Sequence, residues 1–463
     1  MRVLFVASEI YPYAKSGGLA DVADAFVDAA SELVDISRIM PLYGFLDIKN
    51  LQKVDSFEIQ LSSISYDITI YKTTDTKVST YFIDAPMLGS TKNLYGEDGV
   101  DYTNNDLRFG IFCMAVVEFA LRTGIDILHL NDWHSALAAL YVKERQLDIK
   151  TIFTIHNLAY QGIFDFDSLG RIGVSGKHFH MDALEFYGKV NFLKAGIAFC
   201  DVVTTVSKNY AKEILTKEFG CGLDGFLRLH RDKLSGILNG INTDIFNPKT
   251  DRYISVGFDE NTLADKYKNK TAFIKESTLK DPRRPLFVMI ARLVEQKGID
   301  LIIKTSCKML KEKINLFIVG EGDEKFSNQL KELSKKYNNF EFFKGYDEGL
   351  SHRVYASADF LLMPSKFEPC GLNQMIAMRY ATIPIVHSVG GLKESVFESN
   401  DGCGFGIVFK KYSAKEFENA FKRALALKKD KQKFEKIKKA NMQCDFSFKS
   451  SALEYVEIYK KII

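Results

Sequence analysis

Residues 2–26, RVLFVASEIYPYAKSGGLADVADAF, have the pattern of a β-strand, a glycine turn and a helix. The apolar run 2–8 is typical of a buried strand, and residues 20–30 have helical period. Between them lie Lys15 and the pair Gly17 and Gly18. Glycine amides at a helix N-terminus can hold an anion, and Lys15 would add a positive charge. The alternative is a tight turn whose glycines only supply positive φ angles, and the local sequence leaves both interpretations open.

The same alternation of strand and helix continues along the chain, which is typical of parallel sheets covered on both faces. A chain of 463 residues is too long for one ordinary core. We therefore predict an α/β fold with two doubly wound, Rossmann-like domains. The predicted strands are 2–8, 78–84, 126–132, 150–157, 201–207 and 234–240 in the first half, and 285–291, 314–320, 340–346, 359–365, 383–389 and 405–409 in the second.

The domain boundary is predicted from the segment 242–270, which is polar and lacks a sustained strand pattern. We place the first domain at 1–242 and the second at 243–445. The lysine-rich end of the chain has helical period, and its last helix, within 446–463, has enough apolar residues to dock on another part of the protein.

Composition excludes several classes of protein. The 62 lysine and arginine residues against 59 acidic ones leave a net charge of +3, which gives no electrostatic case for a nucleic-acid or membrane partner. No apolar run approaches the ~18 residues of a membrane span, and a strand begins directly after Met1 in place of a signal peptide. The seven cysteines have no CxxC spacing, so we expect neither a disulfide framework nor a zinc site. A cytoplasmic protein is the expectation.

Two motifs in the first half place polar side chains directly after strands. NDWHSAL contains Asp132 and His134, and TIHNLAYQG contains His156. Because ligands bind beyond the carboxyl ends of parallel strands, these groups are candidates for one site. A histidine in such a place is often structural, and Asp132 could simply cap the next helix. Both interpretations remain open at this stage.

The second half offers a matching set of candidates. Arg292 and Lys297, in ARLVEQKGID, follow a strand and suit a diphosphate, although they could be solvated loop side chains. Glu368 lies in a proline-flanked loop, where a carboxylate suits sugar hydroxyls or caps a helix. Gly390 and Gly391 form a second glycine pair before a helix. The dinucleotide fingerprint GxGxxG is absent, which disfavours a nicotinamide enzyme.

Eight motifs together resemble the bacterial glycogen synthases and plant starch synthases, in the order found in that family. They are KSGGLADV, LYGEDGVDYTNNDLRF, NDWHSAL, TIHNLAYQG, GILNGINTDIFNP, ARLVEQKG, SHRVYASADFLLMPSKFEPCGLNQMIAM and VGGLKE. The resemblance runs from Met1 to the terminal helix. It implies the GT-B glycosyltransferase architecture, with two Rossmann-like domains facing each other across a cleft and residues 446–463 crossing back to the first domain.

The resemblance also implies a reaction. Glucose would pass from ADP-glucose to the non-reducing 4-hydroxyl of an α-1,4-glucan, the glycogen primer, with retention of configuration and without a metal or cofactor. A front-face mechanism and a covalent intermediate both remain possible. A related transferase with another nucleotide-sugar donor, or a non-catalytic protein that binds glucan or nucleotide, are the alternatives.

Site residues are carried over by matching motifs. The catalytic set is Lys15, His156, Arg292, Lys297 and Glu368. The donor-binding set adds Gly17, Gly18, Asn239, Gly390 and Gly391, and the acceptor side of the cleft has Tyr95 and Asp132. In this resemblance His156 lies beside the donor glucose, and Glu368 orients that sugar without attacking it.

Four positions depart from the family pattern. Ser16 stands for threonine and keeps the hydroxyl, Asn104 stands for aspartate, and Lys208 stands for proline. Val389 precedes the second glycine pair where threonine is usual, so we expect one hydroxyl contact to the donor to be lost.

Overall fold

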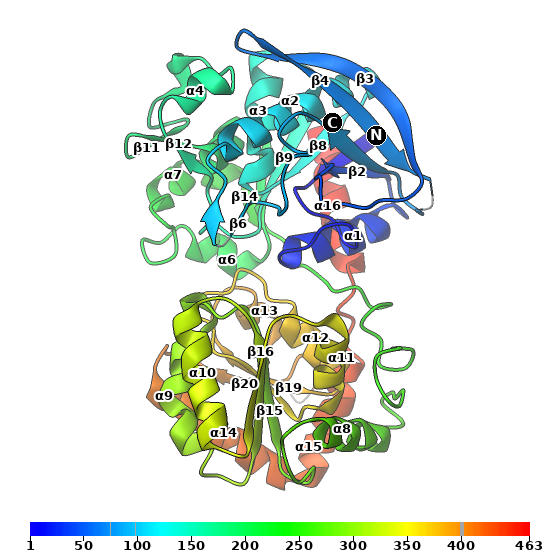
Figure 1. Cartoon of the computed structure of the whole chain (residues 1–463), viewed down its shortest axis with the longest axis vertical. Coiled ribbons are helices and arrows are strands. Elements are labelled where there is room, and N and C mark those ends of the chain that lie inside the picture. Colours follow the sequence, from blue (N-terminus) through cyan, green and yellow to red (C-terminus); the bar gives the residue numbers. More distant parts are fainter. Residues whose placement is uncertain (75, 98, 399–401) are drawn as a thin grey trace. The chain divides into compact units, whose positions relative to one another are not determined.

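The computed structural model describes residues 1–74, 76–97, 99–398 and 402–463. These form two compact units (Figure 1). The first contains Met1–Gly240 and Phe448–Ile463, and the second contains Ile241–Ser447. The chain thus enters the second unit two residues before the predicted boundary, and the terminal helix α16 (Lys449–Ile462) belongs to the first unit.

The first unit is built on a mixed sheet with the strand order β14-β13-β9-β8-β1-β2-β5-β4-β3. Its strands are β1 (Arg2–Val6), β2 (Asp35–Pro41), β3 (Leu51–Leu61), β4 (Ile64–Thr73), β5 (Thr80–Asp84), β8 (Ile127–Asn131), β9 (Lys150–Ile155), β13 (Val202–Thr205) and β14 (Leu234–Gly236). From β14 to β5 the neighbours are parallel, whereas β4 and β3 form an antiparallel hairpin. The six predicted strands of this half are confirmed.

β2 and the hairpin lie outside the predicted runs. Along β3 buried apolar residues alternate with exposed polar or charged ones, as in Phe57–Leu61, so the strand has no continuous apolar run. This alternation is typical of an antiparallel edge with one wet face.

The site of the first unit is positioned by the place in the sheet where the order of the strands reverses, at β1. From β1 the chain proceeds to β2 on one side and later to β8 on the other. The loops that follow β1 and β8 therefore part from each other. In open α/β sheets such a topological switch point is where ligands bind.

Helices cover both faces of this sheet (Figure 1). They are α1 (Gly18–Ala30), α2 (Asn105–Thr123), α3 (Trp133–Glu144) and α5 (Phe192–Phe199), with α16 packed on α1. Tyr455, Val456 and Tyr459 of α16 are buried in the same core as β1 and α1. The Tyr459 hydroxyl lies 2.7 Å from Nδ1 of His129, which fixes the terminal helix to β8.

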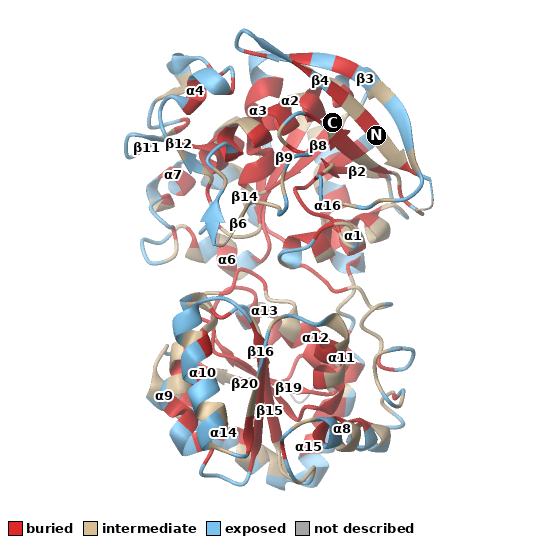
Figure 2. Cartoon of the chain, viewed as in Figure 1, coloured by how far each residue is buried: buried red, intermediate tan, exposed pale blue. Residues whose placement is uncertain are grey.

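The second unit has a parallel sheet with the order β17-β16-β15-β18-β19-β20. Its strands are β15 (Leu286–Ile290), β16 (Asn315–Gly320), β17 (Phe340–Lys344), β18 (Phe360–Met363), β19 (Ile383–His387) and β20 (Ile407–Phe409), which confirms the six predictions. The inner strands β16 and β19 are buried along their whole length (Figure 2), which explains their continuous apolar runs. The switch point lies at β15, between β16 and β18.

Helices flank this second sheet on its two faces (Figure 1). One layer contains α9 (Ile299–Met309), α10 (Glu324–Lys336) and α14 (Ala414–Lys429), and the other contains α8 (Ala264–Glu276), α11 (Glu348–Ser357) and α12 (Asn373–Arg379). The shorter or peripheral elements are β6 (Gly96–Glu97), β7 (Val100–Asp101), β10 (Ile163–Phe164), β11 (Glu185–Phe186), β12 (Lys189–Asn191), α4 (Ser168–Arg171), α6 (Lys208–Glu213), α7 (Asp224–Leu229), α13 (Leu392–Ser395), α15 (Lys431–Met442) and the 3₁₀ turns Gly176–His178, Arg231–Lys233 and Glu295–Lys297.

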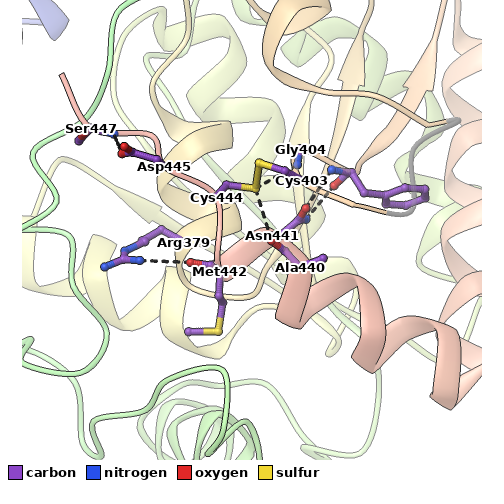
Figure 3. Close-up of a disulfide and its surroundings, with 10 residues drawn as sticks. Arg379, Cys403, Gly404, Ala440, Asn441, Met442, Cys444, Asp445 and Ser447 are labelled. Carbon is purple, nitrogen blue, oxygen red and sulfur yellow. Dashed lines mark hydrogen bonds between the residues drawn. A yellow bond between two sulfur atoms is a disulfide. The ribbon is translucent and has the colours of Figure 1, made fainter. Parts of the chain in front are cut away.

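One disulfide contradicts the expectation from cysteine spacing. Cys403, which precedes β20, is bonded to Cys444, which follows α15, and their Cα atoms lie 5.3 Å apart (Figure 3). Asn441 reinforces this junction by pairing its side-chain amide with both the N–H and the carbonyl of Phe405. The expectation was wrong because α14 and α15 fold back over β20 and join cysteines that are 41 residues apart in sequence.

Candidate functional site

The Lys15–Gly18 turn joins β1 to α1. Gly17 is the N-cap of α1 and has φ of −159°, an extended angle that any residue adopts, and Gly18 is the first helical residue. Among the described residues, a Cβ at Gly17 would meet only Glu9 Oε1, at an ordinary 3.9 Å. The interpretation as a turn that needs positive φ is therefore wrong. The fold leaves room in front of a helix N-terminus, where an anion is favoured.

Glu9 supports this turn, and sequence reasoning missed it. It follows β1 by three residues and is buried, and its Oε2 accepts a hydrogen bond from the backbone N–H of Ser16. Burial raises the pKa of Glu9 to about 7, with smaller contributions from the negative charges of Asp132 and Asp21, against the lowering effect of the Ser16 bonds. The available signal was its place just beyond an apolar strand.

Lys15 lies at the edge of the same turn. Its Nζ is 2.7 Å from Asp21 Oδ1 in the first turn of α1, and both side chains are partly exposed. Nζ also lies 5.6 Å from the centre of the Tyr11 ring. The ammonium group is therefore held beside the N-terminus of α1 by its ion pair with Asp21. Because solvent screens this partly exposed pair, Lys15 can exchange Asp21 for a ligand.

Asp132 joins two loops at the carboxyl edge of the sheet. Its Oδ1 accepts the backbone N–H of His156 at 2.8 Å, so the loop after β8 holds the loop after β9. The backbone of Asp132 has φ 53° and ψ 179°, a region that costs a non-glycine residue about 1–3 kcal/mol. Within the described residues, its side chain makes no capping bond to α3, so the capping interpretation is wrong. Burial raises the pKa of Asp132 to about 7, although the N–H groups of His156 and Asn157 lower it.

The ring of His156 is held by Asn131, the last residue of β8. Nε2 of His156 lies 2.8 Å from Oδ1 of Asn131. Both side chains line a narrow crevice that is also bordered by Thr154 and Asn239. Asn239, which follows β14, therefore lines the same crevice as His156, and its role in donor binding stays a prediction.

Tyr95 lies near the end of β1. Its hydroxyl is 2.8 Å from Ser8 Oγ, and its ring stacks on His134 with centroids 4.5 Å apart. Burial holds the pKa of Tyr95 well above its usual value, so the hydroxyl stays protonated. The predicted residues of the first unit, Lys15, Gly17, Gly18, Tyr95, Asp132, His156 and Asn239, therefore all follow strands of one sheet edge or line its loops.

In the second unit an ion pair joins the loops after β15 and β18. Lys297 Nζ lies 2.9 Å from Oε1 and 2.7 Å from Oε2 of Glu368. Ser365 donates a further hydrogen bond of 2.9 Å to Oε2. Glu368 is buried and precedes Leu372, the N-cap of α12, so it does not serve as that helix's cap. Arg292 is exposed on the same loop as Lys297.

The glycine pair of the second unit packs against the Glu368 loop. Gly390 has φ of +45°, and a Cβ there would lie 1.8 Å from the carbonyl oxygen of Glu368. The N–H of Gly391 donates to the carbonyls of Glu368 and Pro369, each at 3.1 Å. In this structure the amide of Gly391 is bonded within the protein, so its place in the donor-binding set stays a prediction. Val389, in the usual threonine position, is buried.

Cations, a carboxylate and helix N-termini thus stand at the switch points of two doubly wound units. This combination of fold and site defines the chain as a glycosyltransferase of the GT-B architecture. Residues 2–229 match the family model "Starch synthase catalytic domain", and residues 270–441 match "Glycosyl transferases group 1". The chain belongs to the glycogen synthase family, as its full-length relatives show.

Two such relatives are glycogen synthases. The protein from Aquifex aeolicus is 42% identical and covers 100% of this chain and 99% of its own length. The protein from Thermodesulfovibrio yellowstonii is 36% identical, with 100% and 98% covered. A solved structure, the catalytic domain of starch synthase IV from Arabidopsis thaliana bound to ADP and acarbose, has a TM-score of 0.91 and 32% identity over 99% of both chains. Among the described residues, no helix is long and apolar enough to cross a membrane.

Proposed function

We propose that the protein transfers glucose from ADP-glucose to the non-reducing 4-hydroxyl of an α-1,4-glucan, with retention of configuration. The observation that carries this proposal is the site of the second unit, where Lys297 fixes the buried Glu368 at the switch point and Arg292 lies exposed on the loop that carries Lys297. Such a site offers positive charge to a diphosphate and a carboxylate to sugar hydroxyls. The ADP and acarbose in the Arabidopsis starch synthase structure support the same pair of ligands.

In the proposed reaction the second unit holds the leaving group. Arg292 and Lys297 stabilise the negative charge that grows on the diphosphate as the bond from glucose C1 to the phosphate oxygen breaks. Glu368 stays bonded to Lys297 and Ser365, and orients the sugar through its hydroxyls. These groups therefore act in recognition and in charge stabilisation.

We assign the remaining roles in the reaction to residues of the first unit. Lys15 and the open N-terminus of α1 approach the donor phosphates, and His156 lies beside the glucose. A bond forms from C1 to O4 of the acceptor, and the acceptor proton passes to the departing phosphate oxygen. We assign a front-face transfer without an enzyme nucleophile, and Asp132 holds the backbone of His156 in place. Retention follows because attack and departure share one face of the sugar.

We further propose that this transfer needs no metal ion. Lys15, Arg292 and Lys297 would carry the charge that a divalent cation carries elsewhere. Treatment of the purified protein with a chelator should leave the rate unchanged. Loss of activity that added Mg²⁺ restores would contradict this part of the proposal.

The test is an assay with glycogen primer and either ADP-glucose or UDP-glucose, with ADP release and glucan elongation measured together. We expect both with ADP-glucose, and we expect the new linkages to be cut by an α-1,4-specific amylase. Arg292→Ala, with its surface charge matched by Lys366→Ala as a control, should lose turnover. Elongation with only another donor, or donor binding without ADP release, would overturn the proposal.

A further inference from the structure

The side-chain amide of Asn131 is locked in one orientation. Asn131 ends β8, next to β1, and is fully buried. Its Nδ2 donates to two carbonyl oxygens, that of Val6 at 3.0 Å and that of His129 at 3.1 Å. A flipped amide would place Oδ1 against both of these acceptors. The two carbonyls therefore assign Nδ2 and Oδ1 without ambiguity.

This orientation determines which nitrogen of His156 carries the proton. Oδ1 of Asn131 can only accept a hydrogen bond, and it lies 2.8 Å from Nε2 of His156. Nε2 must therefore be the N–H. Burial lowers the pKa of His156 to about 3, so the ring is neutral near pH 7 and has this single proton. Nδ1 is left with a lone pair, and none of the described residues donates a hydrogen bond to it.

The neighbouring His129 shows why this arrangement is informative. His129 is fully buried, and burial lowers its pKa to about 3, so it is also neutral; its Nδ1 and Nε2 both face hydroxyl groups, those of Tyr459 and Thr154, each at 2.7 Å. A hydroxyl donates or accepts equally well, so these partners do not select a tautomer. An amide that is itself fixed by carbonyls does select one, and only His156 has this partner of the two.

The main chain of His156 is fixed from the same place. Asp132, the next residue after Asn131, accepts the backbone N–H of His156 at 2.8 Å. One dipeptide therefore holds both the ring and the main chain of this histidine. The strained backbone of Asp132 is what directs its carboxylate to His156 while Asn131 remains in the strand.

We propose that Asn131 is a positioning residue that holds His156 as the neutral Nε2–H tautomer, so that Nδ1 accepts a hydrogen bond from a hydroxyl of the bound donor sugar. The sugar contact rests on the proposed function, whereas the tautomer does not. In this role His156 recognises the substrate and does not take its proton.

The direct test is ¹⁵N NMR of the full chain labelled at histidine, with the His156 signals assigned by their loss in His156→Asn. We expect Nε2 protonated and Nδ1 unprotonated from pH 5 to pH 8. ADP-glucose, but not ADP, should shift the Nδ1 resonance. A proton on Nδ1 would overturn the tautomer assignment. An Nδ1 resonance that does not shift when ADP-glucose is bound to the protein would overturn the sugar contact.

Variants separate positioning from simple stability. Asn131→Leu should give a mixture of His156 tautomers and raise KM for ADP-glucose about tenfold, the worth of one lost hydrogen bond. Asn131→Asp keeps an acceptor opposite Nε2. Its second oxygen faces the carbonyls of Val6 and His129, so that oxygen should carry a proton and the Nε2–H of His156 should persist. The matched control is Asn315→Leu in the second unit, where Nδ2 also donates to two carbonyls, those of Lys280 and Asp281.

The control should lose stability without changing the His156 tautomer or KM. An unchanged tautomer in Asn131→Leu would overturn the proposal. Should that variant fail to fold, the wild-type spectrum and Asn131→Asp still decide the question. Because the NMR readout needs no turnover, an Nε2–H tautomer in a protein that elongates no glucan would support the role of Asn131 while the proposed function fails.

Discussion

The two glycine pairs of this protein follow the same sequence pattern but exist for different reasons. Both stand between a strand and a helix, at 17–18 and at 390–391. Gly17 has an extended backbone and open space, whereas Gly390 has φ of +45° and touches the backbone of the Glu368 loop. The fold itself requires glycine at the second pair and not at Gly17. A glycine pair therefore indicates a ligand only where the fold does not already need it.

The largest effect is expected at the second pair. Gly390→Ala should destabilise the second unit by about 2–6 kcal/mol, from a left-handed backbone at about 1–3 kcal/mol and overpacking at about 1–3 kcal/mol. Urea unfolding followed by circular dichroism reports both units, and fluorescence of Trp133, the sole tryptophan, reports the first. The circular dichroism transition should move to lower urea more than the fluorescence transition.

Gly188→Ala is the control for backbone strain alone. Gly188 has φ of +80°, but a Cβ there would meet no described atom within 4 Å. Its loss of stability should be the smaller of the two. If Gly390→Ala unfolds at the wild-type urea concentration, the fold does not require glycine at position 390, and the difference between the two glycine pairs is contradicted.

The next effect concerns the charge beside the first pair. Lys15→Ala should lower turnover with ADP-glucose about 10²–10³-fold, because Lys15 would stabilise negative charge that grows in the transition state. Folding should be nearly unchanged, since the pair with Asp21 is partly exposed. Steady-state kinetics with varied ADP-glucose provide the measurement, and Lys77→Ala, whose exposed partner is Glu32, is the matched control. A rise in KM with unchanged kcat would instead indicate uniform binding.

The strands of this fold could be predicted from sequence because parallel strands are buried on both faces and form apolar runs. β1, β9 and β16 are of this kind. The β3–β4 hairpin was not predicted, because its polar residues alternate with apolar ones and form no continuous apolar run. The Cys403–Cys444 disulfide escaped because the two helices that join its ends contribute no local signal.

Lys15, His156 and Glu368 could be proposed from sequence because each lies in a motif on a loop that follows a strand, and their roles stay predictions. The candidate site was not predictable where a residue acts on a partner from another strand. Asn131 and Glu9 were missed for this reason, since their bonds to His156 and Ser16 exist only in the folded sheet edge. The internal bonds of the Gly391 amide could not be foreseen, because its carbonyl partners, Glu368 and Pro369, lie in a loop that is distant in sequence.

The third prediction tests whether the first glycine pair serves ligand binding and not stability. Gly17→Ala should leave the urea midpoint of Trp133 fluorescence unchanged, because the backbone angle and the space both accept a Cβ. KM for ADP-glucose should rise about tenfold, because the new methyl group stands where a phosphate approaches the helix amides. Comparison of KM with the urea midpoint is the measurement. An unchanged KM would mean that no ligand approaches Gly17.

The smallest effect is the pH dependence of the first turn. Glu9 holds Ser16, and its pKa is raised to about 7, chiefly by burial and further by Asp132 and Asp21. As pH falls through 7, the bond from Ser16 loses its charged acceptor, and KM for ADP-glucose should rise about threefold. Glu9→Gln removes this titration and should flatten the profile, whereas Glu332→Gln, on an exposed helix face, should not.

Stability should change with pH in the opposite direction. A carboxyl whose folded pKa lies above its ordinary value of 4.5 binds its proton more tightly in the folded protein, so its stabilisation is present below pH 4.5 and is lost as pH rises through about 7. The first unit should therefore unfold at lower urea at pH 8 than at pH 5, by Trp133 fluorescence. Glu9→Gln should reduce this difference in stability. The part of the difference that comes from Asp132, whose pKa is also raised to about 7, should remain. Equal pH dependence in the variant would show that Glu9 is already ionised at pH 5.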